Sequence, residues 1–134
     1  MTIPVHPNVA LLERLSERIP HDLANAQDLI ADDFVWHFFN LELPDVQGDY
    51  VGLDGLQTFF AKLAALTKGT FQADPVAVNV IGDELVVTHV RDQMQLGDQS
   101  IELDAVVVWR IVRGRIAEAW DIPAIHTIRT LTQS

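Results

Sequence analysis

The run Glu84-Leu-Val-Val-Thr-His-Val-Arg-Asp-Gln-Met-Gln-Leu96 alternates apolar and polar side chains, a period of two that is typical of a strand with one buried face. Asp92 falls on the buried face, among Val86, Thr88, Val90, Met94 and Leu96. A buried carboxylate costs several kcal/mol unless it is paired or takes up a proton, and both situations are frequent in functional pockets. Asp92 is therefore the first candidate site residue.

The same period of two extends over the second half of the chain. Strands are expected at 71–81, 84–96, 99–112 and 115–122, with turns at Gly82-Asp83, Gly97-Asp98 and Arg113-Gly114. Three consecutive hairpins make an antiparallel sheet that is long enough to curl. In the third strand, the odd positions from Ile101 to Ile111 are uniformly apolar, so this face is expected to look inward.

The first half of the chain has helical periodicity, interrupted by one aromatic strand. Helices are expected over 8–19, 22–30 and 53–66, and the run Phe34–Phe39 is expected to form a strand that leads into a loop or hairpin around Gly48–Gly52. These helices can cover only one face of the sheet. The pattern predicts an α+β fold in one domain spanning 1–134.

Composition excludes several classes of function. The chain has 134 residues, a formal charge of −10 and only nine Lys and Arg residues, which argues against nucleic acid as a partner. The absence of cysteine excludes disulfides, thiolate metal sites and a cysteine nucleophile. No apolar run approaches the length of a membrane span and the N-terminus lacks a signal-peptide pattern, so no membrane association and a cytoplasmic location are expected.

The last expected strand leaves one choice open. Ala117, Ala119 and Asp121 share one face, Glu118 and Trp120 the other, and periodicity alone does not decide which is buried. Inward alanines would leave space beside Asp121 within a curved sheet covered by helices. A carboxylate at the end of a row of small residues is what a ligand pocket requires.

Three motifs carry a resemblance to a known family. They are Phe34-Val-Trp-His37, Gly48-x-Tyr50-x-Gly52-x-x-Gly55 followed by Phe59-Phe60, and Gly114-Arg-Ile-Ala-Glu-Ala-Trp-Asp121. With the order of elements, the chain resembles the nuclear transport factor 2-like superfamily over nearly its whole length, and its SnoaL-like polyketide cyclase branch in particular. The resemblance implies a cone-shaped domain whose curved, mixed or antiparallel sheet carries helices on its concave face. Proteins with this fold have several different activities, and each activity depends on particular residues at particular positions.

The resemblance implies different residues for each activity. The acid and base positions of ketosteroid isomerases match Phe38, Leu15 and Val107, so that chemistry is absent. The two aspartates of limonene epoxide hydrolases match Asp92 and Asp121, but their arginine matches Val90. The aspartate that acts as acid and base in SnoaL-like cyclases matches Asp121.

The two aspartates and one histidine are the candidate catalytic residues. Asp121 is the expected general acid and base and Asp92 shares its proton or a water, because two close carboxylates in low dielectric do not ionise together. His37 would reach the base position only through a bulge, and strict alternation places it on the outer face with Val35. The candidate ligand-binding residues are mainly aromatic: Trp36, Phe38, Tyr50, Phe59, Phe60, Val90, Met94 and Trp109.

These residues predict a cofactor-free enzyme of cyclase, isomerase, lyase or hydrolase type that acts on a small apolar molecule. The alternatives are a non-catalytic binder of such a molecule and an interaction module that uses the outer sheet face. No paired histidine spacing predicts a metal site, and no phosphate loop predicts a nucleotide cofactor. Apolar residues on the outer face, including Val106, Val108 and Trp120, predict a homodimer, which the resemblance also implies.

Overall fold

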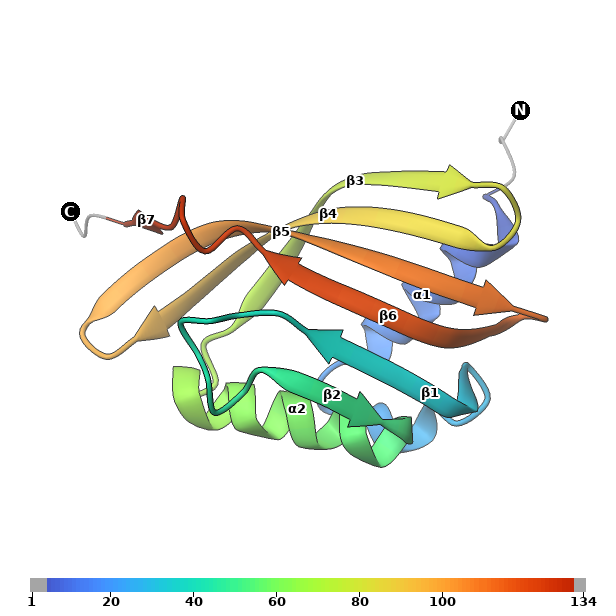
Figure 1. Cartoon of the computed structure of the whole chain (residues 1–134), viewed down its shortest axis with the longest axis horizontal. Helices are drawn as coiled ribbons and strands as arrows, with labels where there is room; N and C mark the ends of the chain where they lie inside the picture. The colour runs from blue at the N-terminus through green and yellow to red at the C-terminus, as the bar shows by residue number, and fades with distance from the viewer. Residues whose placement is uncertain (1–4, 132–134) are drawn as a thin grey trace.

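The computed structural model of the chain describes residues 5–131 (Figure 1). Within these residues, two helices, seven strands and one 3₁₀ turn follow one another: α1 Pro7–Arg18, the 3₁₀ turn Leu23–Asn25, β1 Ile30–Phe38, β2 Gly48–Val51, α2 Gly52–Thr67, β3 Gln72–Ile81, β4 Leu85–Leu96, β5 Gln99–Val112, β6 Arg115–Pro123 and β7 Arg129–Thr130. No helix within residues 5–131 has the length and apolarity to cross a membrane.

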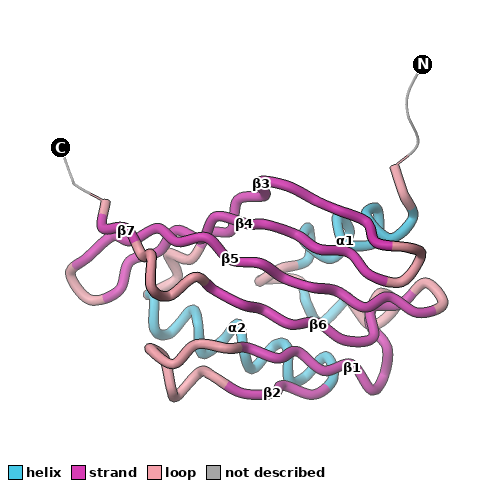
Figure 2. Tube along the Cα trace, turned by 45° about the horizontal axis from the view of Figure 1, so that its top comes forward, coloured by secondary structure: helices cyan, strands magenta, loops and turns pink. Residues whose placement is uncertain are grey.

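The strands form one curved sheet in the order β2-β1-β6-β5-β4-β3, and the short β7 pairs with β5. All neighbouring strands are antiparallel except β1 and β6, which run parallel. Helices α1 and α2 lie on the same side of this sheet (Figure 2). The expected α+β class, with a curved and mostly antiparallel sheet covered by helices on one face, is confirmed.

The alternation of β5 decides which face of the sheet is inner. Its odd residues from Ile101 to Ile111 are all buried, and its even residues are partly or fully exposed. The inner face packs against α2 through Leu56, Phe59 and Leu63. The inner face of the sheet was therefore correctly predicted from the period of two.

Helix α2 lies close to β2 because position 55 has no side chain. A Cβ atom at Gly55 would lie 2.7 Å from the carbonyl carbon of Tyr50, which is closer than atoms of the two residues can approach. The turn from β2 into α2 brings Tyr50 and Phe59 together, with ring centroids 5.3 Å apart. Gly55 of the motif thus sets how closely α2 packs on the edge of the sheet.

The helix expected over 22–30 is wrong. Only the single turn Leu23–Asn25 is helical, and β1 already begins at Ile30, so that Asp32 and Asp33 lie inside the strand. The backbone N–H of Ile116 donates to the carbonyl of Leu29 at 2.9 Å, and Ile30 pairs with Ile116. This pairing with a distant strand overrides the local apolar spacing, which resembles that of a helix.

Candidate active site

A bulge in β6 turns Asp121 inward. The pairing of β5 with β6 shifts between Arg110–Glu118 and Ile111–Ile116, so that Ala117 is an extra residue. After the bulge, Ala119 is fully buried and Asp121 lies opposite the buried Val107 of β5. The choice that periodicity left open is thereby settled, because Ala119 and Asp121 share the inner face.

Asp92 lies on the same inner face, two strands away. It sits opposite Leu103 of β5 and is only 8% exposed. Between Leu103 and Val107, the intervening inward residue of β5 is Ala105. Asp92 and Asp121 therefore lie on opposite sides of Ala105, whose side chain is a single methyl group. At this position no large side chain of β5 stands between the two aspartates.

The two carboxyl groups lack cationic partners among residues 5–131. No ion pair involves either group, and Oδ1 of Asp92 is buried without a hydrogen-bond partner. Burial raises the pKa of Asp92 to about 7, with a smaller contribution from the negative charge of Asp104. Burial also raises the pKa of Asp121 well above its ordinary value, and the charge of Asp92 adds to the rise.

Asp92 and Asp121 form a pair of carboxyl groups that ionise less readily than ordinary aspartates. Near neutral pH such a pair holds at least one proton, because ionising both groups would place two negative charges in a region of low dielectric. The arrangement therefore places two carboxyl groups of raised pKa on one face of the sheet, diagonally across Ala105, and a protonated and an ionised carboxyl group on one face can serve as general acid and general base.

The residues expected to bind a ligand fall into two groups. Five are buried at 9% exposure or less, namely Trp36, Phe38, Tyr50, Phe59 and Trp109, and three are partly exposed, namely Phe60, Val90 and Met94. The buried rings pack on one another, with Phe59 at the centre: its centroid lies 4.9 Å from that of Phe38 and 5.4 Å from that of Trp36. Phe38 pairs with Asp121 in the register of β1 and β6, so these five buried rings, called here the aromatic wall, lie beside Asp121 on the inner face.

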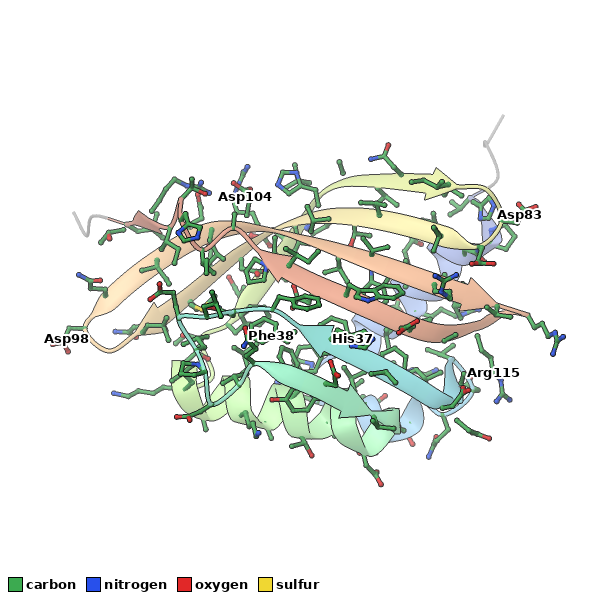
Figure 3. All side chains as sticks on the ribbon, viewed as in Figure 1. His37, Phe38, Asp83, Asp98, Asp104 and Arg115 are labelled. Atoms are coloured by element: carbon green, nitrogen blue, oxygen red, sulfur yellow. The ribbon has the colours of Figure 1, made fainter. Side chains whose placement is uncertain are left out.

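His37 lies on the outer face, apart from the two aspartates. Its Nδ1 is 2.6 Å from Oδ1 of Asp49 and its Nε2 is 2.7 Å from Oε2 of Glu118. The ring stacks on Trp120, with centroids 5.5 Å apart. His37 and its neighbour Phe38 are labelled in Figure 3, and their side chains take opposite faces of β1. The pairing of β1 with β6 shifts between Ile30 and Val35, but it is regular from Val35 to Phe38, so Trp36 and Phe38 are buried and His37 stays on the outer face.

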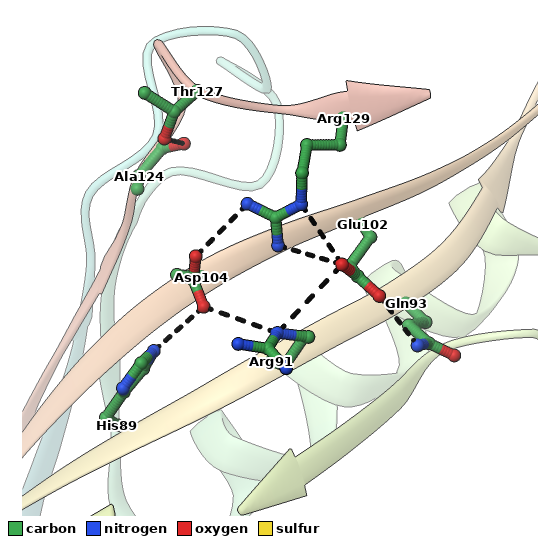
Figure 4. A network of polar contacts seen from close by, with 8 residues as sticks. All are labelled: His89, Arg91, Gln93, Glu102, Asp104, Ala124, Thr127 and Arg129. Carbon is green, nitrogen blue, oxygen red and sulfur yellow. Dashed lines mark hydrogen bonds and ion pairs between the residues drawn. The ribbon is translucent and has the colours of Figure 1, made fainter. Parts of the chain in front are cut away.

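A second cluster of polar residues lies on the outer face, where β4, β5 and β7 meet (Figure 4). His89 Nε2 is 2.8 Å from Oδ1 of Asp104, and Arg129 donates to Glu102 at 2.9 Å and to Asp104 at 3.2 Å. His89 and Arg91 are polar positions of the run 84–96, whose alternation predicts that they lie opposite the buried face, whereas Arg129 follows the last expected strand and was not predicted. A depression of about 400 Å³ lies beside His89 and Asp104, reaching Pro123 and Ala124.

Comparison with known proteins identifies the family. No curated protein matches the chain. Solved structures with this fold include an NTF2-like protein of unknown function from Burkholderia pseudomallei K96243, with 21% identity, 87% of this chain and 90% of that chain covered, and a TM-score of 0.77. A candidate SnoaL-like polyketide cyclase from Jannaschia sp. CCS1 has 15% identity, with 94% and 92% covered and a TM-score of 0.74.

Wild-type IdmH, described as a candidate polyketide cyclase from Streptomyces antibioticus, has 22% identity to this chain, with 92% of this chain and 95% of that chain covered and a TM-score of 0.70. Identities this low establish the shared fold. The model of the SnoaL-like domain matches residues 10–119, which is most of the chain and includes β1 to β5 entire. The chain therefore belongs to the SnoaL-like domain family.

Proposed function

We propose that this protein is a cofactor-free enzyme that moves protons on a small apolar molecule, with Asp121 as the general acid and base and Asp92 sharing its proton. The family match and the polyketide cyclase-like neighbours support a small-molecule cyclase or isomerase family. The observation that carries the aspartate assignment is the pair itself: two inward carboxyl groups flanking Ala105, one with an unpartnered buried oxygen.

The raised pKa values favour one division of labour. Asp121, whose pKa is raised by burial and by the charge of Asp92, is the acid of the pair and donates its proton to a carbonyl oxygen of the substrate. Asp92, with a pKa of about 7, is partly ionised and removes a proton from the carbon next to that carbonyl. Passing the proton from Asp92 back to Asp121 restores the starting state. A cyclase, isomerase, lyase or hydrolase step can each use this exchange.

The Asp121→Asn variant tests the assignment. Asparagine keeps the size of the side chain but neither donates an acidic proton nor accepts one as a base, so turnover is expected to fall by at least about 100-fold while folding and ligand affinity persist. The substrate is first sought by native mass spectrometry of the freshly expressed protein, which detects a co-purifying ligand.

The matched control is Asp98→Asn, because Asp98 lies in the exposed turn between β4 and β5 (Figure 3). This change makes the same substitution in an exposed turn, outside the aspartate pair, and is expected to leave turnover unchanged. Wild-type turnover in the Asp121→Asn variant would refute the catalytic role of Asp121.

Non-catalytic binding is the second candidate function. It is favoured by the burial of five of the aromatic wall residues, since residues so closely packed also serve as ordinary core. The two functions differ in one measurement. A binder retains its ligand without converting it, so the wild-type protein would return the co-purified molecule chemically unchanged after prolonged incubation.

The homodimer expected from the sequence remains part of this proposal. Val106 and Ile122 on the outer face are 37% and 47% exposed, and they border the depression beside Asp104. Apolar side chains gathered on one sheet face support a contact between two copies. Light scattering after size-exclusion chromatography is expected to give twice the 15.0 kDa mass of the chain; a monomer mass would refute it.

A further inference from the structure

Trp36 holds a buried hydrogen-bond donor that none of the described residues satisfies. The residue is 4% exposed, and its Nε1 atom has no hydrogen-bond partner. Its ring lies between Phe59, Phe60 and Trp109, which offer no acceptor oxygen in their side chains. Unsatisfied buried N–H groups are rare in folded proteins because each loses its bond to water without replacement.

The neighbouring indole shows that this inner face can satisfy a tryptophan. Trp109, whose centroid is 5.5 Å from that of Trp36, donates from Nε1 to Oγ1 of Thr88 at 3.0 Å. The two neighbouring tryptophans thus differ. The N–H group of Trp109 is hydrogen-bonded within the protein, whereas that of Trp36 has no partner among the described residues. The leftover donor of Trp36 needs a reason that packing alone does not supply.

The strand register places Trp36 next to the aspartate pair. Trp36 of β1 pairs with Ala119 of β6, and Asp121 is the next inward residue along β6. Trp36 and Asp121 are therefore diagonal neighbours on one face, with the methyl group of Ala119 and the ring of Phe38, which pairs with Asp121, at the other two corners. Asp92, on the same face, carries the second unpartnered atom, a buried acceptor oxygen. The inner face thus offers one free donor and one free acceptor in addition to the carboxyl of Asp121.

We propose that Nε1–H of Trp36 binds an oxygen of the substrate, and that the substrate is a flat, largely apolar aromatic ketone whose carbonyl oxygen lies between Trp36 and Asp121. An indole N–H only donates, so the group that it recognises must be an acceptor. The surrounding rings, which pack on one another at tilted and edge-to-face angles, are apolar, and aromatic side chains favour contact with another aromatic ring. This inference rests on the proposed function and adds to it the residue that fixes the carbonyl.

The role follows from where charge develops. When a proton leaves the carbon next to the carbonyl, negative charge moves to the carbonyl oxygen, and donors aimed at that oxygen stabilise the enolate. Asp121 supplies one donor as its acid form and Trp36 the other. The oxygen keeps the proton of Asp121 in the enol, while the hydrogen of Trp36 stays on its nitrogen, so Trp36 positions and stabilises without exchanging a proton.

A pair of probes with and without the oxygen tests this inference. Ligand-observed NMR with 1-tetralone and tetralin, which share their ring skeleton, measures how much the carbonyl adds to affinity. The wild-type protein is expected to prefer 1-tetralone by about tenfold, the scale of one hydrogen bond from a buried donor. In Trp36→Phe this preference is expected to disappear, while tetralin affinity changes little.

Two further variants separate the N–H group from the shape of the ring. Benzothienylalanine at position 36 replaces the N–H group by sulfur in a ring of the same outline and is expected to lose the preference as well. Trp120→Phe alters a tryptophan on the outer face, stacked on His37, and is expected to keep it. An unchanged preference in either position-36 variant, equal binding of the two probes by the wild type, or binding of neither probe would overturn the inference.

The failure of the proposed function can be told apart from the failure of this inference. If Asp121→Asn retains turnover while the position-36 variants lose the carbonyl preference, the donor role of Trp36 stands and the acid–base assignment falls. If Asp121→Asn loses turnover while the position-36 variants keep the preference, the reverse holds.

Discussion

The pKa values of carboxyl groups are shifted in opposite directions on the inner and outer faces of the sheet. On the outer face, Glu102 and Asp104 accept hydrogen bonds from Gln93, His89 and Arg129, and the pKa of each carboxyl is lowered, chiefly by these bonds. On the inner face, burial raises the pKa of Asp92 and of Asp121. Asp104 and Asp92 are nearly neighbours, since Asp104 pairs with Arg91. The environment, and not the type of residue, therefore separates groups that stabilise the fold from groups that cost stability.

The largest expected effect is that of Asp92 on stability at neutral and alkaline pH. The pKa of Asp92 is raised from 3.8 to about 7, so the folded state binds its proton more tightly than the unfolded state does. The contribution of Asp92 to stability then falls as pH rises from about 4 to about 7, by about 4 kcal/mol in total as an upper estimate. Asparagine does not ionise, so the free energy of unfolding of Asp92→Asn, relative to that of the wild type, is expected to increase over this pH range. Urea unfolding of both proteins at pH 4 and pH 8 measures the gain.

The comparison of the two pH values removes the effects that asparagine has on packing, because these are the same at pH 4 and at pH 8. A free-energy difference between the two proteins that does not change with pH would show that Asp92 is not a burden on folding. Asp92→Asn is also expected to lose turnover, so that stability and activity move in opposite directions, as at many functional sites.

Asp104→Asn tests the outer face and should give the opposite sign. The pKa of Asp104 is lowered, first by the hydrogen bond from His89, so its contribution to stability is present above pH 3.8 and is lost as pH falls through the lowered value. The variant is expected to be less stable than the wild type at pH 7 and to match it at low pH. Equal stability at pH 7 would contradict the role of the network.

The same variant also links the two faces. Because the charge of Asp104 contributes to the raised pKa of Asp92, its removal is expected to lower the pKa of Asp92 toward its ordinary value. A carbon-detected NMR titration of the aspartate carboxyl groups measures the change. If the pKa of Asp92 does not move, the two carboxylates are not coupled through the sheet.

The inner position of Asp92 could be predicted from the sequence, whereas that of Asp121 could not. In β4 the period of two is unbroken through residues 84–96, so a local pattern is sufficient. In β6 the bulge at Ala117 interrupts the alternation, and both faces carry apolar residues, so the decision depends on the pairing of Ile116 with Ile111 of another strand. The helix expected over 22–30 failed for the same reason, since Leu29 and Ile30 are held by β6.

The partners within the site were still harder to predict. The unpartnered nitrogen of Trp36 and the bond from Trp109 to Thr88 depend on how two indoles pack between β1, β5 and α2, which no spacing along the chain records. Arg129 reaches Glu102 across 27 positions of sequence. Sequence periodicity gives the face of a residue, and only the assembled sheet gives its contacts.

The smallest expected effect is that of His37, whose place on the outer face can be tested by its own titration. Burial lowers the pKa of His37, but the hydrogen bonds with Asp49 and Glu118 outweigh it, and the net change is a raised pKa. A ring with a carboxylate within 2.7 Å of each nitrogen can donate to both only as the imidazolium. Its contribution to stability is then complete below pH 6.5 and is lost as pH rises through the raised value.

His37→Gln is accordingly expected to lower the melting temperature at pH 6 and to approach the wild type at alkaline pH. The change is small because Asp49 is largely exposed and solvent screens the pair. A proton NMR titration of the imidazole measures the pKa directly. If the titration of His37 followed the occupancy of the inner site by 1-tetralone, His37 would belong with the aspartates after all; an imidazole pKa that is indifferent to the probe keeps the two faces distinct.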